Sequence, residues 1–85
     1  MHPEQVIVTL HTESGQFEAD YELPASLKAE KLNKLLLTTL AQQNPQQFGS
    51  WQGLRLYHNG APLPDHCSLA DRSLWDGSVL MIRKE

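Results

Sequence analysis

The chain has 85 residues, with seven Lys and Arg against ten Asp and Glu, and a formal net charge of −3. This length suits a single domain over residues 1–85, with a core at about 5–83, and a hydrophobic fraction of 40% is typical of a folded chain. Because basic residues form no run along the sequence, we expect no nucleic acid among its partners. No apolar stretch approaches the roughly 20 residues of a membrane span, so direct membrane insertion is not expected.

Two alternating segments predict a β-hairpin at the start of the chain. Residues 5–11 (QVIVTLH) and 17–23 (FEADYEL) repeat with the two-residue period of strands. Glu13, Ser14 and Gly15 supply the turn between them. One face of the first strand carries Val6, Val8 and Leu10, and the opposite face carries Ile7, Thr9 and His11.

Residues 27–43 change to the helical period. Their apolar residues fall on one helix face, and these are Ala29, Leu32, Leu36 and Leu40. Leu35 is expected to widen this stripe, and Ser26 or a neighbour is the expected N-cap. Pro45 ends the helix, because proline disfavours helical geometry in the residue before it.

The next segments predict a loop, a strand and a hairpin turn. Residues 44–53 are expected to form a polar loop that carries the aromatic residues Phe48 and Trp51. Residues 54–57 alternate ahead of a turn at Asn59-Gly60. A short edge strand is expected around Leu63, because the prolines on either side of it cannot donate to a ladder.

The end of the chain predicts a capped turn and a last strand. Residues 68–74 (SLADRSL) are typical of a capped turn or short helix, with Leu69 and Leu74 directed inward. A tight turn at Asp76-Gly77 precedes a strand over residues 78–83. That strand carries Leu80 and Ile82 on one face and Val79 and Met81 on the other.

This order of elements predicts an α+β fold. One helix crossing one face of a mixed sheet of four to five strands is the simplest way to bury these apolar faces together. That is the β-grasp arrangement.

Several motifs resemble known β-grasp proteins. LRLYHNGAPLPD is similar to the third strand, glycine turn and short fourth strand of ubiquitin, and SLADRSLWDGSVLMI is similar to the loop leading into its last strand. A narrower resemblance, carried by ELPASLKAEKLNKLLLTTL and DGSVLMI, is to the YukD/EsaB family, small bacterial ubiquitin-like proteins associated with type VII secretion systems. This resemblance covers about residues 5–83.

The resemblance implies an accessory or regulatory component of a secretion system, in the cytoplasm, that binds protein partners of the machine. The alternative is a generic ubiquitin-like adaptor domain with another cytoplasmic partner. Conjugation of a ubiquitin-like protein requires a C-terminal diglycine, whereas this sequence ends in Arg83-Lys84-Glu85. We therefore expect non-covalent docking, with the caution that a fold does not determine a function.

No constellation of residues predicts catalysis, a cofactor or a metal site. Cys67 is the single cysteine, which excludes an intrachain disulfide and fits a reducing compartment. Asp65 and His66 precede it, but neighbours on an extended segment point to opposite sides and do not form a dyad. His58, His66 and Cys67 flank one hairpin without the spacing of metal ligands. We expect no enzymatic activity.

The strand alternation predicts instead a protein-binding surface on the sheet face opposite the helix. The apolar residues left on that face are Ile7, Tyr57, Val79 and Met81. In the resemblance to ubiquitin, whose usual partner surface is this face, Tyr57 takes the position of the central isoleucine. Strand propensity alone is the other explanation of these residues, and a monomer and a weak dimer both stay open.

The two tryptophans lie in loops. Trp75 is expected to pack at the edge of the core beside Leu74. For Trp51 the sequence leaves core packing and partner binding open, since tryptophan is common in both settings.

Overall fold

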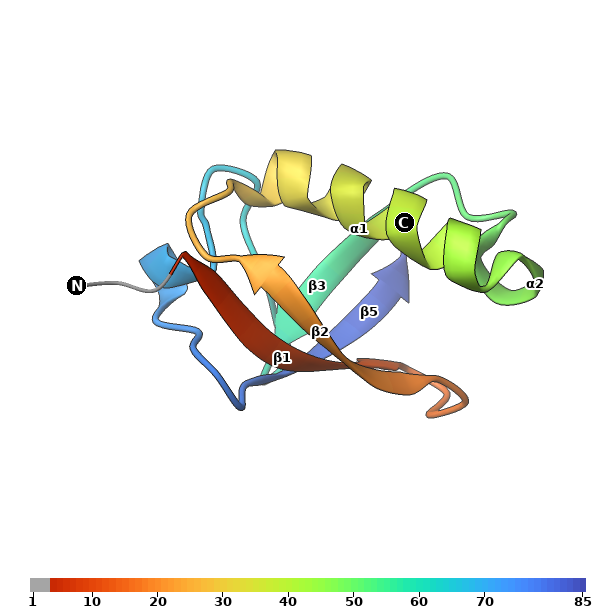
Figure 1. Ribbon diagram of the computed structural model, residues 1–85, viewed down its shortest axis with the longest axis horizontal. Coiled ribbons are helices and arrows are strands. Elements are labelled where there is room, and N and C mark those ends of the chain that lie inside the picture. The colour runs from red at the N-terminus through yellow and green to blue at the C-terminus, as the bar shows by residue number, and fades with distance from the viewer. Residues whose placement is uncertain (1–3) are drawn as a thin grey trace.

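The computed structural model describes residues 4–85; residues 1–3, which the predicted domain includes, lie outside the described part of the chain. Residues 4–85 form one mixed sheet crossed by a long helix (Figure 1). The strands are β1 (Gln5–Thr12), β2 (Glu18–Pro24), β3 (Leu54–His58), β4 (Ala61–Pro62) and β5 (Val79–Lys84). The helices are α1 (Ala29–Gln43), α2 (Pro45–Phe48) and the 3-10 turn η1 (Ala70–Arg72).

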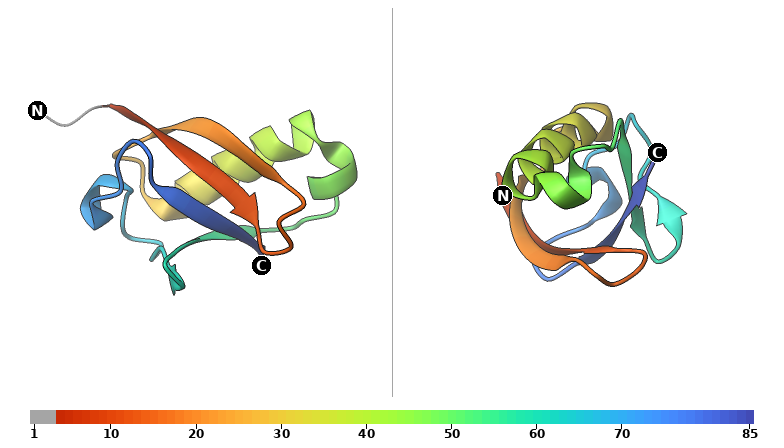
Figure 2. Two further views of the ribbon diagram at one scale, coloured as in Figure 1. Left: turned by 90° about the horizontal axis from the view of Figure 1, so that it is seen from below. Right: turned by 90° about the vertical axis from the view of Figure 1, so that its right-hand side faces the viewer.

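The strands lie in the order β2-β1-β5-β3-β4, which places β2 and β4 at opposite edges of the sheet (Figure 2). β1 pairs with β5 in parallel at the centre, and the other three pairings are antiparallel. A parallel pair needs a long crossover connection between its strands, which α1 and the segments after it supply here. The predicted α+β class, with one helix across a mixed sheet, is confirmed.

The core lies between α1 and the sheet. The strands contribute the inward residues that the alternation predicts, and α1 contributes Ala29, Leu32, Leu36 and Leu40, all at most 1% exposed. Phe48 at the end of α2 is also fully buried, at 0% exposed. The prediction of a polar loop over residues 44–53 is therefore wrong at this residue, because Pro45 starts a second short helix that directs Phe48 into the core.

Two details of α1 differ from the prediction. Leu35 is 47% exposed and does not widen the buried stripe. The N-cap residue is Lys28, which makes no side-chain cap, so Ser26 has no capping role. Instead, the amides of Ala29 and Glu30 donate to the carbonyls of Cys67 and Asp65 at 2.8 and 3.1 Å. The first turn of the helix is thus satisfied by a segment far away in the sequence.

The short segments near the end of the chain follow the predictions with small shifts. The edge strand lies at Ala61–Pro62, and Leu63 follows it as a buried residue whose amide donates to the carbonyl of Leu56 at 2.9 Å. Leu69 and Leu74 are buried, and Trp75 packs against the edge of the core as predicted. Within residues 4–85, no helix has the length and apolar character needed to cross a bilayer.

Candidate protein-binding surface

The sheet face opposite α1, called the open face below, carries the side chains that strand alternation directs away from the core. Ile7 is 48% exposed and Val79 is 52% exposed, while Tyr57 and Met81 are half-buried. Their sequence neighbours on the other face, such as Leu56 and Leu80, are buried. The four residues predicted for this surface therefore all face away from the core.

The strand register brings three of these residues together. Tyr57 of β3 lies directly opposite Met81 of β5, and Met81 is also in register with His11 of β1. With Val79, these side chains line one shallow hollow of about 270 Å³. Pockets for small molecules are typically about 300–1,000 Å³ and more enclosed, so this hollow better suits a side chain presented by a protein partner.

Ile7 lies apart from that hollow, although it shares the open face. It is in register with Glu22 of β2, toward the other end of β1. Its amide donates to Oδ1 of Asp76 at 2.7 Å, and its carbonyl accepts from the amide of Gly77 at 2.9 Å. Its backbone therefore holds the turn before β5, where Gly77 has a positive φ of 89°.

Three further residues line the hollow that the predicted set did not include. His11 lines the hollow, and the strand alternation had already placed its side chain on this face, so the sequence contained that signal. Asn59 and Gly60 also line the hollow, in a turn where both have positive φ. The sequence predicted this turn, but its position beside Met81 depends on the β3–β5 register, which no local pattern reveals.

Arg83 places a positive charge beside the hollow. Its Cζ atom lies 5.3 Å from the centre of the Tyr57 ring, within the range of a cation–π interaction. Its Nε is also 3.4 Å from a carboxylate oxygen of Glu13, at the β1–β2 turn. Arg83 therefore packs against the half-buried ring of Tyr57 and gives the apolar surface a charged rim.

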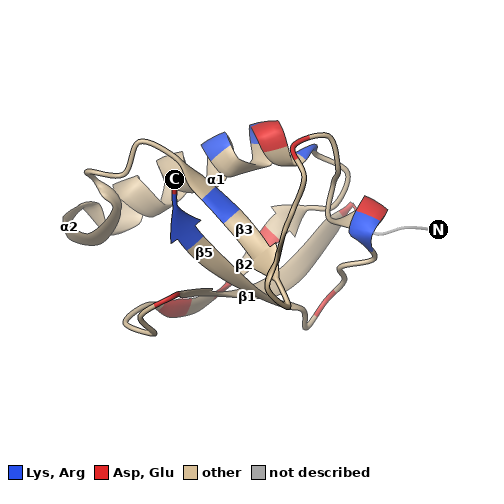
Figure 3. Ribbon diagram, turned by 180° about the vertical axis from the view of Figure 1, so that it is seen from behind, with Lys and Arg blue, Asp and Glu red and all other residues tan. Residues whose placement is uncertain are grey.

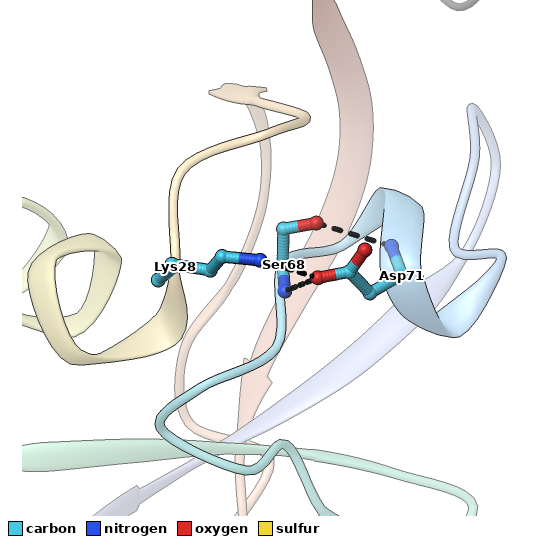
Figure 4. Close-up of polar contacts among 3 residues, drawn as sticks. All are labelled: Lys28, Ser68 and Asp71. Carbon is cyan, nitrogen blue, oxygen red and sulfur yellow. Dashed lines mark hydrogen bonds and ion pairs between the residues drawn. The ribbon is translucent and has the colours of Figure 1, made fainter.

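The segment around Cys67 has a structural role. Cys67 is half-buried; its amide donates to Pro64, and its carbonyl accepts from the start of α1. Across residues 4–85, no group of three His, Cys, Asp or Glu side chains has the arrangement of a metal site. Neighbouring residues join the segment before η1 to η1 itself (Figure 4): Asp71 and Ser68 each accept a hydrogen bond from the other's amide, at 2.9 and 3.1 Å.

Asp71 is the described carboxylate with the clearest perturbation. The Ser68 amide, and then the Nζ of Lys28 at 2.9 Å, lower the pKa of Asp71 from 3.8 to about 2. Both donors favour the ionised form, and the side chain stays about half exposed. The lowered pKa of Asp71 thus arises in part from the contact between Lys28, at the start of α1, and η1.

Trp51 packs against the core from the loop after α2. Its ring lies 4.9 Å from that of Phe48, centre to centre, at 75°. The aromatic pair covers the end of the core, which favours packing for Trp51 over a separate binding role.

A mixed sheet crossed by one helix, with a partly apolar open face, defines a β-grasp domain of the ubiquitin-like class. The ubiquitin-like domain of the Mycobacterium tuberculosis type VII secretion system protein ECCD1 is 25% identical, with a TM-score of 0.72 over 92% of this chain and 96% of that one. The EccD5 ubiquitin-like domain from Mycobacterium xenopi is 19% identical, with a TM-score of 0.76 over 98% and 97%.

Residues 5–82 match the family model of the WXG100 protein secretion system (Wss) protein YukD, and the chain belongs to that family. It is thus a ubiquitin-like, secretion-associated module. A chain of the MycP5-free ESX-5 inner membrane complex is 23% identical with a TM-score of 0.77; 98% of the present chain is covered, but only 21% of the length of that one. No curated protein matches the chain.

Proposed function

We propose that this chain is a non-catalytic protein-binding module that docks non-covalently, in the cytoplasm, onto a protein component of a type VII secretion apparatus. The observation that carries the proposal is the cluster of Tyr57, Val79 and Met81 around one hollow of the open face. Single exposed apolar residues are ordinary, whereas a cluster on one face is typical of an interaction site.

Membership of the YukD family supports the kind of partner. A chain of the ESX-5 inner membrane complex contains a segment with the same fold, as about a fifth of its length. A domain of this fold is therefore compatible with a secretion complex at the inner membrane. We infer that the partner surface belongs to the part of such a complex that faces the cytoplasm.

The chemistry of the surface indicates how such a partner would bind. Protein interfaces combine an apolar centre with a polar rim. Tyr57 and Met81 supply the apolar centre, and His11, Asn59 and Arg83 supply hydrogen-bonding groups around it. An apolar anchor side chain of the partner would fill the hollow, with polar contacts at the edge.

The test measures binding of the purified chain to the detergent-solubilised secretion complex of the same organism by surface plasmon resonance. Tyr57→Ala and Val79→Asp remove the centre of the surface. Leu35→Asp is the matched control, because Leu35 is as exposed as Val79 but lies on α1, on the other side of the molecule. Hot-spot residues, which cluster near the centre of an interface, contribute about 2 kcal/mol or more, so we expect each open-face variant to bind at least about tenfold more weakly.

The control variant should bind as the unchanged chain does. The proposed surface would be contradicted if Leu35→Asp weakened binding as much as the open-face variants do. It would also be contradicted if neither Tyr57→Ala nor Val79→Asp weakened binding. Circular dichroism of each variant tests whether it is folded, so that a loss of binding is not mistaken for unfolding. A complex that survives boiling in detergent would be covalent and would contradict non-covalent docking.

A further inference from the structure

The free edge of β2 is a second feature of the sheet, separate from the open-face hollow. β2 is an edge strand of seven residues, paired with β1 on one side only, and its pairing runs from Glu18 to Pro24 without a bulge. The opposite edge is protected in the usual way, because β4 has two residues and one of them is Pro62. β2 has no such protection over most of its length (Figure 2).

The register identifies the backbone groups that face outward. The amide of Ala25 donates to Glu4, and the amide of Thr12 donates to the carbonyl of Phe17, at the two ends of the β1–β2 pairing. In an antiparallel pair, hydrogen-bonded residues alternate with residues whose backbone points away. Counting inward from both ends, the outward amides and carbonyls belong to Glu18, Asp20 and Glu22.

The side chains of these three residues are all acidic and exposed. Within residues 4–85, the carboxylates that form ion pairs with Lys or Arg are those of other residues. Glu18, Asp20 and Glu22 therefore have no cationic partner there. Thr9 donates to one oxygen of Asp20 at 2.6 Å, which holds that carboxylate on the open-face side of the strand. Figure 3 shows the basic residues of the sheet on β3 and β5, away from this edge.

The alternate residues of β2 are apolar and partly exposed toward the α1 side. Ala19 and Tyr21 are half-buried, and the ring of Phe17 stacks on that of Tyr21 at 6.5 Å between centres. The Tyr21 hydroxyl donates to Gln43 of α1 at 2.6 Å, which fixes its direction. One edge therefore offers unpaired backbone, an acidic row and an apolar row.

We propose that this edge binds an extended segment of a partner protein that adds as a further strand and alternates basic with apolar side chains. Opposite residues of paired strands place their side chains on the same face, with Cβ atoms about 5 Å apart. Lys or Arg at every second position would thus face Glu18, Asp20 and Glu22. The residues between them would pack beside Ala19 and Tyr21. Backbone pairing supplies the attachment and the charges supply the selectivity.

The charges argue against a second copy of this chain as the occupant. Two β2 strands paired antiparallel about a two-fold axis at Asp20 would set Glu18 against Glu22 and the two Asp20 side chains against each other. Like charges directly opposite one another destabilise a strand pair. The same three carboxylates therefore repel a copy and attract a basic strand.

The test uses the full chain, labelled with ¹⁵N, and a blocked seven-residue peptide in which lysine and valine alternate. We expect shifts and slower hydrogen exchange at the amides of Glu18, Asp20 and Glu22, and binding that weakens as salt is added. Two matched peptides serve as controls. In one, glutamate replaces lysine; in the other, the same residues are rearranged with all lysines first. Equal binding of either control peptide would overturn the proposal.

Two sets of variants separate charge from backbone. The triple variant Glu18→Gln, Asp20→Asn, Glu22→Gln keeps the strand but removes three opposite-charge pairs, so it should bind the lysine–valine peptide at least about threefold more weakly. Glu22→Pro removes an outward amide but no bond to β1, so it should weaken binding beyond Glu22→Gln. If Glu22→Pro fails to fold, hydrogen exchange of the unchanged chain still tests the backbone contact.

Three results would overturn the inference. The first is unchanged binding by the triple variant. The second is a set of shifts centred on Val79 and Met81 with β2 unaffected, which would move the peptide to the open-face hollow. The third is a dimer of the chain alone, seen by sedimentation, whose contact maps to β2. None of these results bears on the secretion partner, so the two proposals fail separately.

Discussion

Phe48 offers the sharpest test of how this small core is held together. It is fully buried, although it lies in a stretch of polar residues. Its ring meets those of Phe17 and Trp51 edge to face, at 5.1 and 4.9 Å between centres and at 87° and 75°. Phe48→Ala removes the ring that joins the β1–β2 turn to the loop after α2.

The expected loss follows from burial and geometry. Replacing a buried phenylalanine by alanine costs about 3–5 kcal/mol, which includes the cavity left behind. The two edge-to-face pairs add roughly 0.5–1.5 kcal/mol each beyond area burial, and this places the change toward the upper part of that range. Small domains have total stabilities near the lower end of about 5–15 kcal/mol. Phe48→Ala should therefore remove most of the stability and lower the Tm by at least roughly 12 °C.

Urea unfolding followed by circular dichroism measures the effect, with Leu35→Ala as the control for an exposed site. Leu35 is 47% exposed, so its substitution should change stability by less than about 0.5 kcal/mol. Phe48→Leu keeps most of the volume and should cost about 1–2 kcal/mol, mainly the aromatic pairs. A cost for Phe48→Ala no greater than that for Leu35→Ala would refute the view of Phe48 as part of the core.

Three further predictions concern stability. Leu36→Ala, at a fully buried position of α1, should cost roughly 2–5 kcal/mol in the same urea assay; a value under about 1 kcal/mol would contradict its place in the core. Gly77→Ala should cost about 1–3 kcal/mol, because Gly77 has a φ of 89°, and a thermal melt equal to that of the unchanged chain would argue against that turn. The pKa of Asp71 in the folded chain, about 2, lies below its ordinary 3.8, so its stabilisation is present above about pH 4 and is lost as the pH falls toward 2. Asp71→Asn should therefore have a lower free energy of unfolding than the unchanged chain at pH 7, and this difference should shrink as the pH falls. A difference independent of pH would contradict stabilisation by the ionised carboxylate.

The sequence predicts well wherever burial repeats with a regular period. The alternation of Val6, Val8 and Leu10 and the helical spacing of Leu32 and Leu36 each arise because one face of an element meets the core. Those patterns gave the order of elements and the α+β class, and the structure confirms both. The open face followed from the same patterns, as the residues left over after the inward face was assigned.

The sequence patterns did not predict structural features that lack a regular spacing of residues. Phe48 is one buried residue among polar neighbours, so no local pattern separates it from an exposed aromatic residue. Leu35 lies about 100° around the helix from the centre of the buried stripe, outside a stripe about 100° wide, so the helical spacing itself fits its exposure. The cap of α1 by Cys67 and Asp65 depends on chain segments more than thirty residues apart. The burial of Phe48 and the cap of α1 depend on tertiary packing, which local spacing does not encode.

The two proposed surfaces are neighbours on one sheet, and a single partner could contact both. Met81 on β5 lies about two strand spacings, roughly 10 Å, from β2. His11 of β1 also lines the hollow and lies opposite Glu18, so the hollow comes within one strand of the β2 edge. A partner that offers a basic extended segment and an apolar anchor could occupy both sites at once. Its overall affinity would then exceed that of either contact, because the second contact forms within one complex. Saturating the β2 edge with the lysine–valine peptide should then weaken docking of the secretion complex without abolishing it; complete loss would show that the two surfaces are one site.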